Sequence, residues 1–272
     1  MPELPEVETV RRSLKKLVLN KKILSASVYW SNIIAYPEVK EFEEKIKNQT
    51  ILDINRYGKW LMFELNDYYL LSHLRMEGKY FIRKTEDPKE KHQHVFFHLD
   101  DGTDLRYNDI RKFGKMYLLN KDEVYKVKPL SLLGLEPWDS KLTKDYLKEK
   151  FHKKPIKTEL LDQSIIVGIG NIYVDEILFL SKINPTKLAT KLTNKELENI
   201  IINTKKILEE AIESGGTTIK SYTSSEGVHG RFQENLLVHT KDICPICKNK
   251  IKKIKIGGRT TYYCIKCQKK WD

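Results

Sequence analysis

The pattern of hydrophobic and polar positions divides the chain into an opening helix, a series of short strands and a later helical region. Apolar residues recur every three or four positions from Val7 to Leu17, which predicts a helix with one buried face. Pro5 suits an early helical position, and Glu6 and Glu8 complement the positive end of the helix dipole. The chain is therefore expected to begin with an amphipathic helix.

After about residue 50 the hydrophobic period shortens to that of strands. The strand segments are rich in Ile, Leu, Tyr and Phe, and turn pairs such as Asn66-Asp67 and Asp101-Gly102 separate them. They lie near residues 51–56, 60–65, 68–74, 79–83, 94–99, 103–107 and 115–119. This pattern predicts an antiparallel β-sandwich or barrel.

Helical periodicity returns in the second half of the chain. Thr193 and Glu196 have capping-box spacing ahead of a long helix, and Gly215-Gly216 ends that helix. The stretch from Thr217 to Arg231 is rich in Gly, Ser and Thr, which predicts a mobile loop. The apolar face of the long helix includes Leu197, Ile200, Ile201, Leu208 and Ile212.

These patterns predict an α+β multidomain chain. An N-terminal antiparallel β-sandwich with flanking helices covers residues 1–130, and a linker marked by Pro and Gly follows at 131–142. A helical domain occupies 143–237, and a compact cysteine-bearing tail occupies 238–272.

Composition narrows the class of protein. The chain has 272 residues, 40% of them hydrophobic and 32% charged, which favours a globular protein over a disordered one. Lys and Arg exceed Asp and Glu by 49 to 37, a net charge of +12, which suits a polyanionic partner without locating its site. Neither a membrane-length apolar stretch nor a signal-like start is found, so we expect a cytoplasmic protein.

The four cysteines form two close pairs near the end of the chain. Cys244 and Cys247 are separated from Cys264 and Cys267 by 16 residues, the spacing of a four-thiolate zinc site with a hairpin between its two knuckles. Four protein ligands leave no position for a reactive water, so we expect one structural Zn²⁺ ion. The tail is too short to build a large core, and metal binding would supply its folding energy.

Several motifs in one order resemble those of formamidopyrimidine-DNA glycosylases. The opening ten residues, MPELPEVETV, carry the first of them, and the four-cysteine finger carries the last. Between them lie the motifs GKW at 58–60, HLRMEG at 73–78, KHQHV at 91–95, NDIRKFG at 108–114, GIGNIY at 168–173 and GGTT at 215–218.

The resemblance implies a monomeric base-excision repair enzyme that acts on double-stranded DNA. Such an enzyme flips out an oxidised purine, 8-oxoguanine or a formamidopyrimidine, excises it and cleaves the abasic strand by β,δ-elimination. The implied fold joins a two-layered β-sandwich to a helical domain with a helix–two-turns–helix motif and to a zinc finger β-hairpin.

The resemblance also implies a catalytic pair at the N-terminus. Once Met1 is removed, Pro2 presents a secondary amine, and an α-amino group has a pKa of about 8 against about 10.4 for lysine. Attack on the sugar C1′ would form an iminium, and Glu3 would act as the acid. Glu3 and Glu6 can also serve only as complements to the helix dipole, as we expect for Glu8.

Two cations match residues of the elimination steps. Lys59 matches the lysine assigned to β-elimination, and its alternative is a solvated turn lysine. Arg259, in the second arm of the finger, matches the arginine linked to δ-elimination and phosphate binding, for which a planar guanidinium is suited.

Other matches concern binding of the DNA. Met76, Arg111 and Phe113 match residues that fill the void left by the flipped base, although Met76 and Phe113 could equally be core residues. Residues 217–231 correspond to a loop that closes over that base. Contacts with the DNA backbone are expected from His92, from Asn171 and from Lys153 or Lys154, with Lys154 preferred.

Two alternatives stay open from the sequence. An endonuclease VIII-like enzyme shares the catalytic proline and glutamate and prefers oxidised pyrimidines, but the opening residues 2–9 favour the purine enzymes. A basic zinc protein that binds nucleic acid without catalysis is the second alternative.

Overall fold

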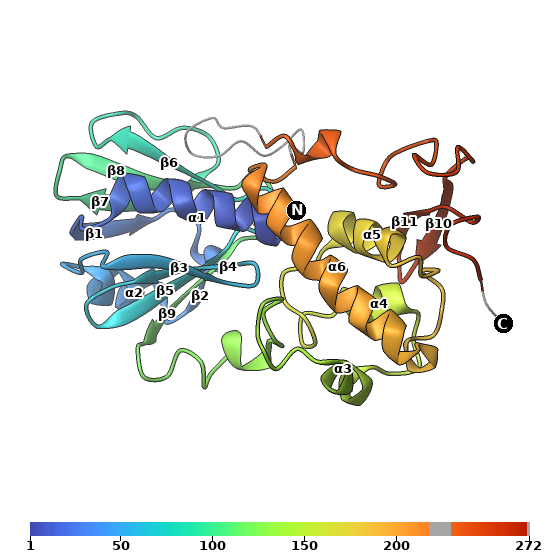
Figure 1. Cartoon of the computed structure of the whole chain (residues 1–272). Coiled ribbons are helices and arrows are strands. Elements are labelled where there is room, and N and C mark those ends of the chain that lie inside the picture. Colours follow the sequence, from blue (N-terminus) through green and yellow to red (C-terminus); the bar gives the residue numbers. More distant parts are fainter. Residues whose placement is uncertain (218–229, 271–272) are drawn as a thin grey trace. The chain divides into compact units, whose positions relative to one another are not determined.

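The computed structural model describes residues 1–217 and 230–270 (Figure 1). The chain forms two compact units, Met1–Ser131 with Thr217–Gly230, and Leu132–Gly216 with Arg231–Asp272. Each unit is described separately below. Among the described residues, none of the helices combines the length and the apolar character that crossing a bilayer requires.

The first unit opens with the predicted amphipathic helix, α1, which spans Leu4–Val18. Its buried stripe includes Val7, Val10, Leu14 and Val18, and these side chains belong to the main hydrophobic core. Glu3 occupies the N-cap position, so the residues expected to carry chemistry lie at the very start of a well-packed helix. This packing fixes the direction in which the N-terminus leaves the core.

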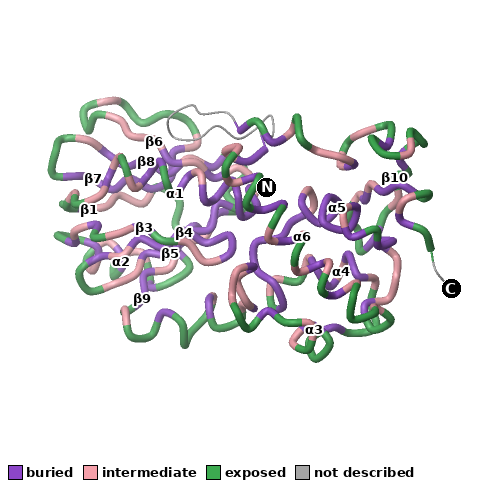
Figure 2. Tube along the Cα trace, in the orientation of Figure 1, coloured by how far each residue is buried: buried purple, intermediate pink, exposed green. Residues whose placement is uncertain are grey.

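Two sheets form the body of the first unit, which confirms the predicted sandwich. One sheet has the strand order β1-β7-β8-β6 and the other β2-β9-β5-β4-β3. Their buried side chains form one core, and Figure 2 marks the buried residues along the trace in purple. All pairings are antiparallel except the parallel pairing of β2 with β9. The strands are β1 Ile23–Val28, β2 Ile34–Tyr36, β3 Asp53–Tyr57, β4 Trp60–Glu64, β5 Tyr68–His73, β6 Lys79–Lys84, β7 Gln93–Leu99, β8 Thr103–Asn108 and β9 Lys115–Asn120.

Helix α2, Val39–Ile46, and a short 3₁₀ helix, Ser31–Ile33, lie between β1 and β3 in the chain. No element was predicted for this region from the sequence. Phe42 and Ile46 of α2 are fully buried in the core of the sandwich.

Two connections cross between the sheets at one corner of the sandwich. Residues 74–78 lead from β5 to β6, and residues 109–114 lead from β8 to β9. The strands on either side are paired, because His73 lies opposite Lys115 and Lys79 lies opposite Asn108. The two turns therefore leave the same end of the sandwich.

The second unit is mostly helical and ends in a hairpin. Its long helix α6, Asn194–Glu213, starts with the predicted capping box of Thr193 and Glu196, and the Gly216 N–H donates to the Ala211 carbonyl at 2.7 Å at its end. The other elements are α3 Lys144–Lys150, α4 Ile156–Leu160, α5 Asn171–Leu180, β10 Lys252–Ile256, β11 Arg259–Tyr263, and short 3₁₀ helices at Ala189–Lys191 and Phe232–Glu234. A further 3₁₀ helix, Leu130–Leu132, lies at the boundary between the two units in the chain.

Candidate active site and metal centre

Met1 is half-buried, and the residues that follow it are buried together with acidic groups. Pro2 is buried, and Glu3 is only 3% exposed. Burial lowers the pKa of the Met1 amine most, while Glu3 and Glu6 raise this pKa and the charge of Lys59 lowers it. These effects place the amine within electrostatic reach of both carboxylates and of a lysine more than 50 residues away in the chain.

Glu6 links the N-terminus to the start of the predicted loop. One oxygen of its carboxylate accepts the Glu3 backbone N–H at 2.8 Å, and the other accepts the Thr217 N–H at 2.8 Å and the Thr217 hydroxyl at 3.1 Å. Glu6 is therefore more than a dipole partner, which the sequence left open. The remainder of that loop, residues 218–229, lies outside the described residues.

Glu8 has a different environment from Glu3 and Glu6. Its carboxylate forms ion pairs with Arg11 and Arg12 at 2.8 Å and with Arg56 at 3.4 Å. Although burial alone would raise the pKa of Glu8, hydrogen bonds from Arg11 and Arg12 lower it overall. Glu8 is thus held as a carboxylate and serves α1 structurally.

Lys59 lies in the two-residue turn between β3 and β4, next to Gly58, whose φ of +55° suits glycine. Lys59 is only 6% exposed, so it is not a solvated turn lysine, the alternative that the sequence left open. The neighbouring Trp60 ring packs edge-on against the His73 ring at 4.8 Å. Burial, together with the charges of Arg75 and Lys59, lowers the pKa of His73 to about 3, so this imidazole is neutral.

The three expected void-filling residues lie on the two crossover turns. Phe113 is 49% exposed and Met76 is half-buried, so Phe113 is not a core residue. The exposed Arg111 guanidinium lies 4.8 Å from the centre of the Phe113 ring. An exposed aromatic ring beside a cation, at the corner of a rigid sandwich, can stack on bases and approach an orphaned partner.

His92 immediately precedes β7 and adopts a positive φ of 69°. Its carbonyl accepts the backbone N–H of Asp109 at 3.0 Å, and Asn108 donates to the neighbouring Lys91 carbonyl at 3.3 Å. His92 is therefore tied to the turn that bears Arg111 and Phe113.

In the second unit, Asn171 is the first residue of α5 and its amide donates to the Thr260 carbonyl at 3.0 Å. An amide nitrogen carries two N–H groups, so this bond does not exhaust its donors. Arg259, next to Thr260, is exposed at the start of β11. The expected contacts Asn171 and Arg259 are thus brought close to each other.

The lysine candidates separate by burial. Lys153 and Lys154 are exposed, whereas Lys157, which the sequence did not single out, is fully buried. Its ammonium contacts Asp175 at 2.8 Å and the Thr260 carbonyl at 3.0 Å. A lysine-rich segment offers no sequence signal for which member turns inward.

The four cysteine sulfurs lie within 4.8 Å of one another. Sulfur separations of 3.8 Å for Cys244 to Cys267 and 3.4 Å for Cys247 to Cys264 compare with about 3.8 Å along the edge of a zinc–thiolate tetrahedron. The Asn249 amide also approaches the Cys247 sulfur at 3.3 Å, a typical outer contact of a thiolate ligand. The residues present therefore fit a structural zinc ion.

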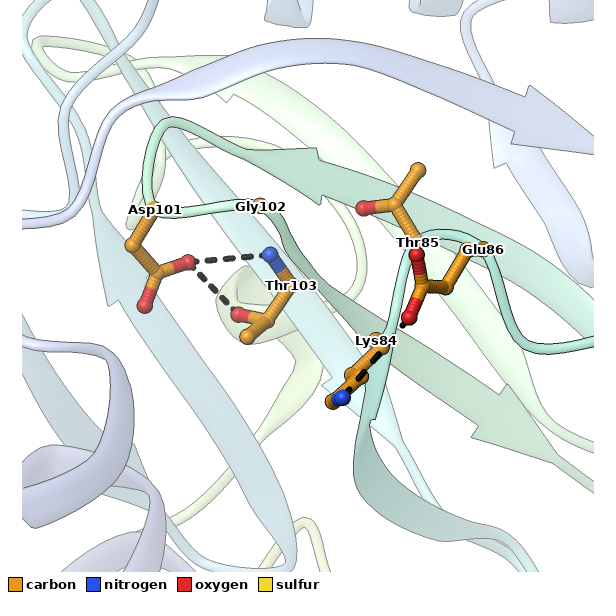
Figure 3. A pocket seen from close by; sticks show the side chains of 6 residues that line it. All are labelled: Lys84, Thr85, Glu86, Asp101, Gly102 and Thr103. Carbon is orange, nitrogen blue, oxygen red and sulfur yellow. Dashed lines mark hydrogen bonds and ion pairs between the residues drawn. The ribbon is translucent and has the colours of Figure 1, made fainter.

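A separate surface hollow of about 610 Å³ lies at the far end of β6 and β8 (Figure 3). It is lined by polar groups that already pair, since Asp101 accepts the Thr103 N–H and hydroxyl and Lys84 lies 3.7 Å from Glu86. The strand register places Lys84 and Thr103 five residues from the ends that bear the crossover turns. This hollow is therefore distinct from the candidate site.

Comparison with known families assigns the chain along nearly its whole length. The formamidopyrimidine-DNA glycosylase N-terminal domain matches residues 1–116, the formamidopyrimidine-DNA glycosylase H2TH domain matches 133–223, and the zinc finger found in FPG and IleRS matches 243–270. The chain belongs to the formamidopyrimidine-DNA glycosylase family. The family match confirms the resemblance, the helix–two-turns–helix domain and the structural zinc finger.

Individual members of this family are similar over their full lengths. The formamidopyrimidine-DNA glycosylase of Bacillus licheniformis is 49% identical over 99% of this chain and 100% of its own, and that of Bacillus subtilis is 48% identical over the same shares. Both relatives bear the name formamidopyrimidine-DNA glycosylase.

Three solved Lactococcus lactis structures have the same fold. A variant FPG in complex with Fapy-dG-containing DNA has a TM-score of 0.92 at 37% identity, covering 99% of this chain and 100% of that one. The complex with abasic-site DNA has a TM-score of 0.90 at 38% identity, covering 98% and 100%, and the complex with oxidised-pyrimidine DNA has 0.91 at 37%, covering 99% and 100%.

Proposed function

We propose that the chain is a bifunctional DNA glycosylase and abasic-site lyase that excises 8-oxoguanine and formamidopyrimidines from double-stranded DNA. Family membership supports the glycosylase activity. The observation that carries the lyase proposal is that the buried Pro2 stands beside the buried Glu3, while Glu3, Glu6 and Lys59 all act electrostatically on the amine of the preceding residue, Met1. This arrangement supplies a nucleophile, an acid and a cation without any redox cofactor.

In the first step, the Pro2 nitrogen of the processed chain attacks C1′ of the damaged nucleotide. The glycosidic bond breaks and the base leaves with the bonding electrons. The Pro2 nitrogen loses its N–H proton, and this loss balances the proton that the base takes up. Glu3 protonates the ring oxygen O4′, the sugar ring opens, and the nitrogen lone pair forms the iminium with C1′. Because Glu3 is buried, this proton transfer would take place away from bulk water.

The iminium then serves as the electron sink for both eliminations. Loss of the C2′ proton forms the C2′–C3′ double bond and expels the 3′ phosphate, with Lys59 stabilising the charge that develops on it. Loss of the C4′ proton expels the 5′ phosphate in the same way, and Arg259 binds phosphate during this step. Water hydrolyses the final iminium and regenerates Pro2.

Binding is proposed to rest on phosphate contacts from His92, Lys154 and Asn171, with Met76, Arg111 and Phe113 occupying the void. Zinc holds the finger hairpin that presents Arg259. A chromosomal DNA substrate agrees with the expected cytoplasmic location. We also expect the protein to act as a monomer.

Covalent trapping tests the proposal. Borohydride added to the processed chain and abasic-site DNA should reduce the iminium to a stable adduct, and mass spectrometry should place the adduct on Pro2. The matched control retains Met1, so that its Pro2 nitrogen is an amide and it should trap nothing. Adduct formation on any other residue, or equal trapping by the Met1 form, would contradict the mechanism.

A substrate panel separates the alternatives. Duplexes with 8-oxoguanine, formamidopyrimidine or thymine glycol should be ranked by single-turnover excision, with the two purine lesions cleaved faster. Fastest excision of thymine glycol would favour the endonuclease VIII-like alternative, for which the oxidised-pyrimidine complex of the Lactococcus lactis protein makes a comparison worthwhile. Tight binding without any excision would favour a non-catalytic binder.

A further inference from the structure

The two crossover turns of the sandwich are joined by one buried tyrosine. Tyr107 is completely buried near the end of β8, and its ring packs 5.1 Å from that of Tyr80. A Cβ atom added to Gly78 or to Gly114 would overlap the Tyr107 hydroxyl. Since Gly78 ends the turn of residues 74–78 and Gly114 ends the turn of residues 109–114, the hydroxyl is packed between the backbones of both turns.

Asp109 holds the second turn from within. Its carboxylate, completely buried, accepts the Arg111 N–H at 3.0 Å on one oxygen and the Gly114 N–H at 2.8 Å on the other. The Tyr107 hydroxyl lies 3.4 Å from that second oxygen. Both ends of the segment that bears Arg111 and Phe113 are thus fastened to one side chain, which Tyr107 reaches as well.

The backbone of Asp109 extends the same network. Its N–H donates to the His92 carbonyl at 3.0 Å, and its carbonyl lies 2.9 Å from Nε2 of the buried His94.

Local bonds also close the first turn. The Arg75 N–H donates to Nδ1 of the neutral His73 at 3.0 Å, and the Gly78 N–H donates to the Leu74 carbonyl at 2.9 Å. The half-buried Met76 therefore lies in a short turn that is fixed at both ends and whose Gly78 packs against Tyr107.

We propose that Tyr107 and Asp109 are positioning residues that unite the two turns into one preformed wedge, so that Met76, Arg111 and Phe113 enter the duplex together. This inference rests on the proposed function, in which those three side chains fill the void. Ordering a free segment costs conformational entropy, and a wedge that is already ordered in the free protein avoids that cost during base extrusion. It also keeps the Phe113 ring exposed instead of letting it collapse onto the core.

Two conservative variants test the wedge. Asp109→Asn keeps the shape of the side chain but replaces one acceptor oxygen by an NH₂ group, which would face the N–H of Arg111 or Gly114. Tyr107→Phe removes only the hydroxyl. Gly102→Asn is the matched control, because Gly102 precedes the other end of β8, nothing lies within 4 Å of its added Cβ, and Asn tolerates its φ of +76°.

The readouts are single-turnover excision of formamidopyrimidine from a duplex and borohydride trapping on single-stranded abasic DNA, which has no stack to fill. Asp109→Asn should slow duplex excision by about tenfold or more, because one buried N–H is left without an acceptor. Its trapping on single-stranded DNA should stay within about twofold of that of the natural chain. Tyr107→Phe should change duplex excision in the same direction by a smaller factor. Phe113→Ala should reproduce this pattern, and Gly102→Asn should change neither readout.

The outcomes distinguish the inference from the function on which it rests. Equal losses on both substrates, or unchanged duplex excision in both variants, would overturn the wedge while leaving the lyase chemistry intact. No trapping by the processed natural chain would instead overturn the proposed function. Thermal melting checks that each variant is folded, and Tyr107→Phe carries the test if Asp109→Asn does not fold.

Discussion

The buried pair of Lys157 and Asp175 makes a quantitative prediction about how the finger hairpin is held in the second unit. Both side chains are fully buried and their charged atoms are 2.8 Å apart. Lys157 also donates to the Thr260 carbonyl at 3.0 Å, and the other Asp175 oxygen accepts the Tyr262 N–H at 3.2 Å and lies 2.8 Å from Nδ1 of His239. Two strand residues of β11 are therefore fixed to α4 and α5.

The expected loss in the free energy of unfolding follows from the burial of both charged side chains. Attraction at 2.8 Å amounts to about 6 kcal/mol at an effective dielectric constant of about 20, and desolvation of the two ions offsets most of it. Lys157→Met removes the attraction but leaves the carboxylate buried, which should lower the free energy of unfolding by about 3–5 kcal/mol. For a chain of this size the expected loss of Tm is about 6–20 °C.

A double-mutant cycle provides the assay. Calorimetric unfolding should be measured for Lys157→Met, Asp175→Leu and the double variant, with Lys195→Met on the exposed surface of α6 as the control. The double variant should recover at least half of the loss of Lys157→Met, because no lone buried charge remains. A loss below about 1 kcal/mol in Lys157→Met, or a double variant less stable than both single variants, would refute the reasoning.

Three further predictions concern the metal, salt and pH. Cys264→Ser should lower the bound zinc measured by mass spectrometry and weaken DNA binding, and unchanged values of both would show that the finger does not need four thiolates. Counterion release depends on the cations that neutralise phosphates, so affinity for a lesion duplex should fall roughly tenfold between about 50 and 200 mM salt if Lys59 and Arg259 both contact phosphates; flat affinity would exclude these two contacts. Lys59 lowers and Glu6 raises the pKa of the Met1 amine. If the same two charges act on the Pro2 nitrogen of the processed chain, the pH below which trapping is lost should rise in Lys59→Met and fall in Glu6→Gln; shifts in the same direction would contradict the proposed cluster.

The regular elements were predictable where one face of an element is buried. Helices α1 and α6 and strands β3 to β9 follow from the period of their apolar residues. The region from β1 to α2 was missed, because β1 beyond Ile23 is mostly half-buried and shows no clean alternation. The parallel pairing of β2 with β9 depends on tertiary contacts that a local pattern does not encode.

The residues of the candidate site were predictable from motifs, whereas the hydrogen bonds that connect them were not. Pro2, Glu3 and Lys59 came from the family resemblance, and the structure brings a buried lysine into reach of the N-terminus. The bond from Glu6 to Thr217 spans 211 residues, and the partner of a buried polar group at such a separation has no local signature. The roles of the individual residues in catalysis and DNA binding stay predictions until the variants are measured.

The carbonyl of Thr260 receives donors from both Lys157 and Asn171, so α4 and α5 recognise the hairpin through its main chain. Main-chain recognition is indifferent to the identity of the side chain at the recognised position. A library randomised at position 260 should therefore retain most substitutions, whereas one randomised at 157 or 171 should retain few. The finger can in this way diversify its outward surface during evolution without losing its anchorage.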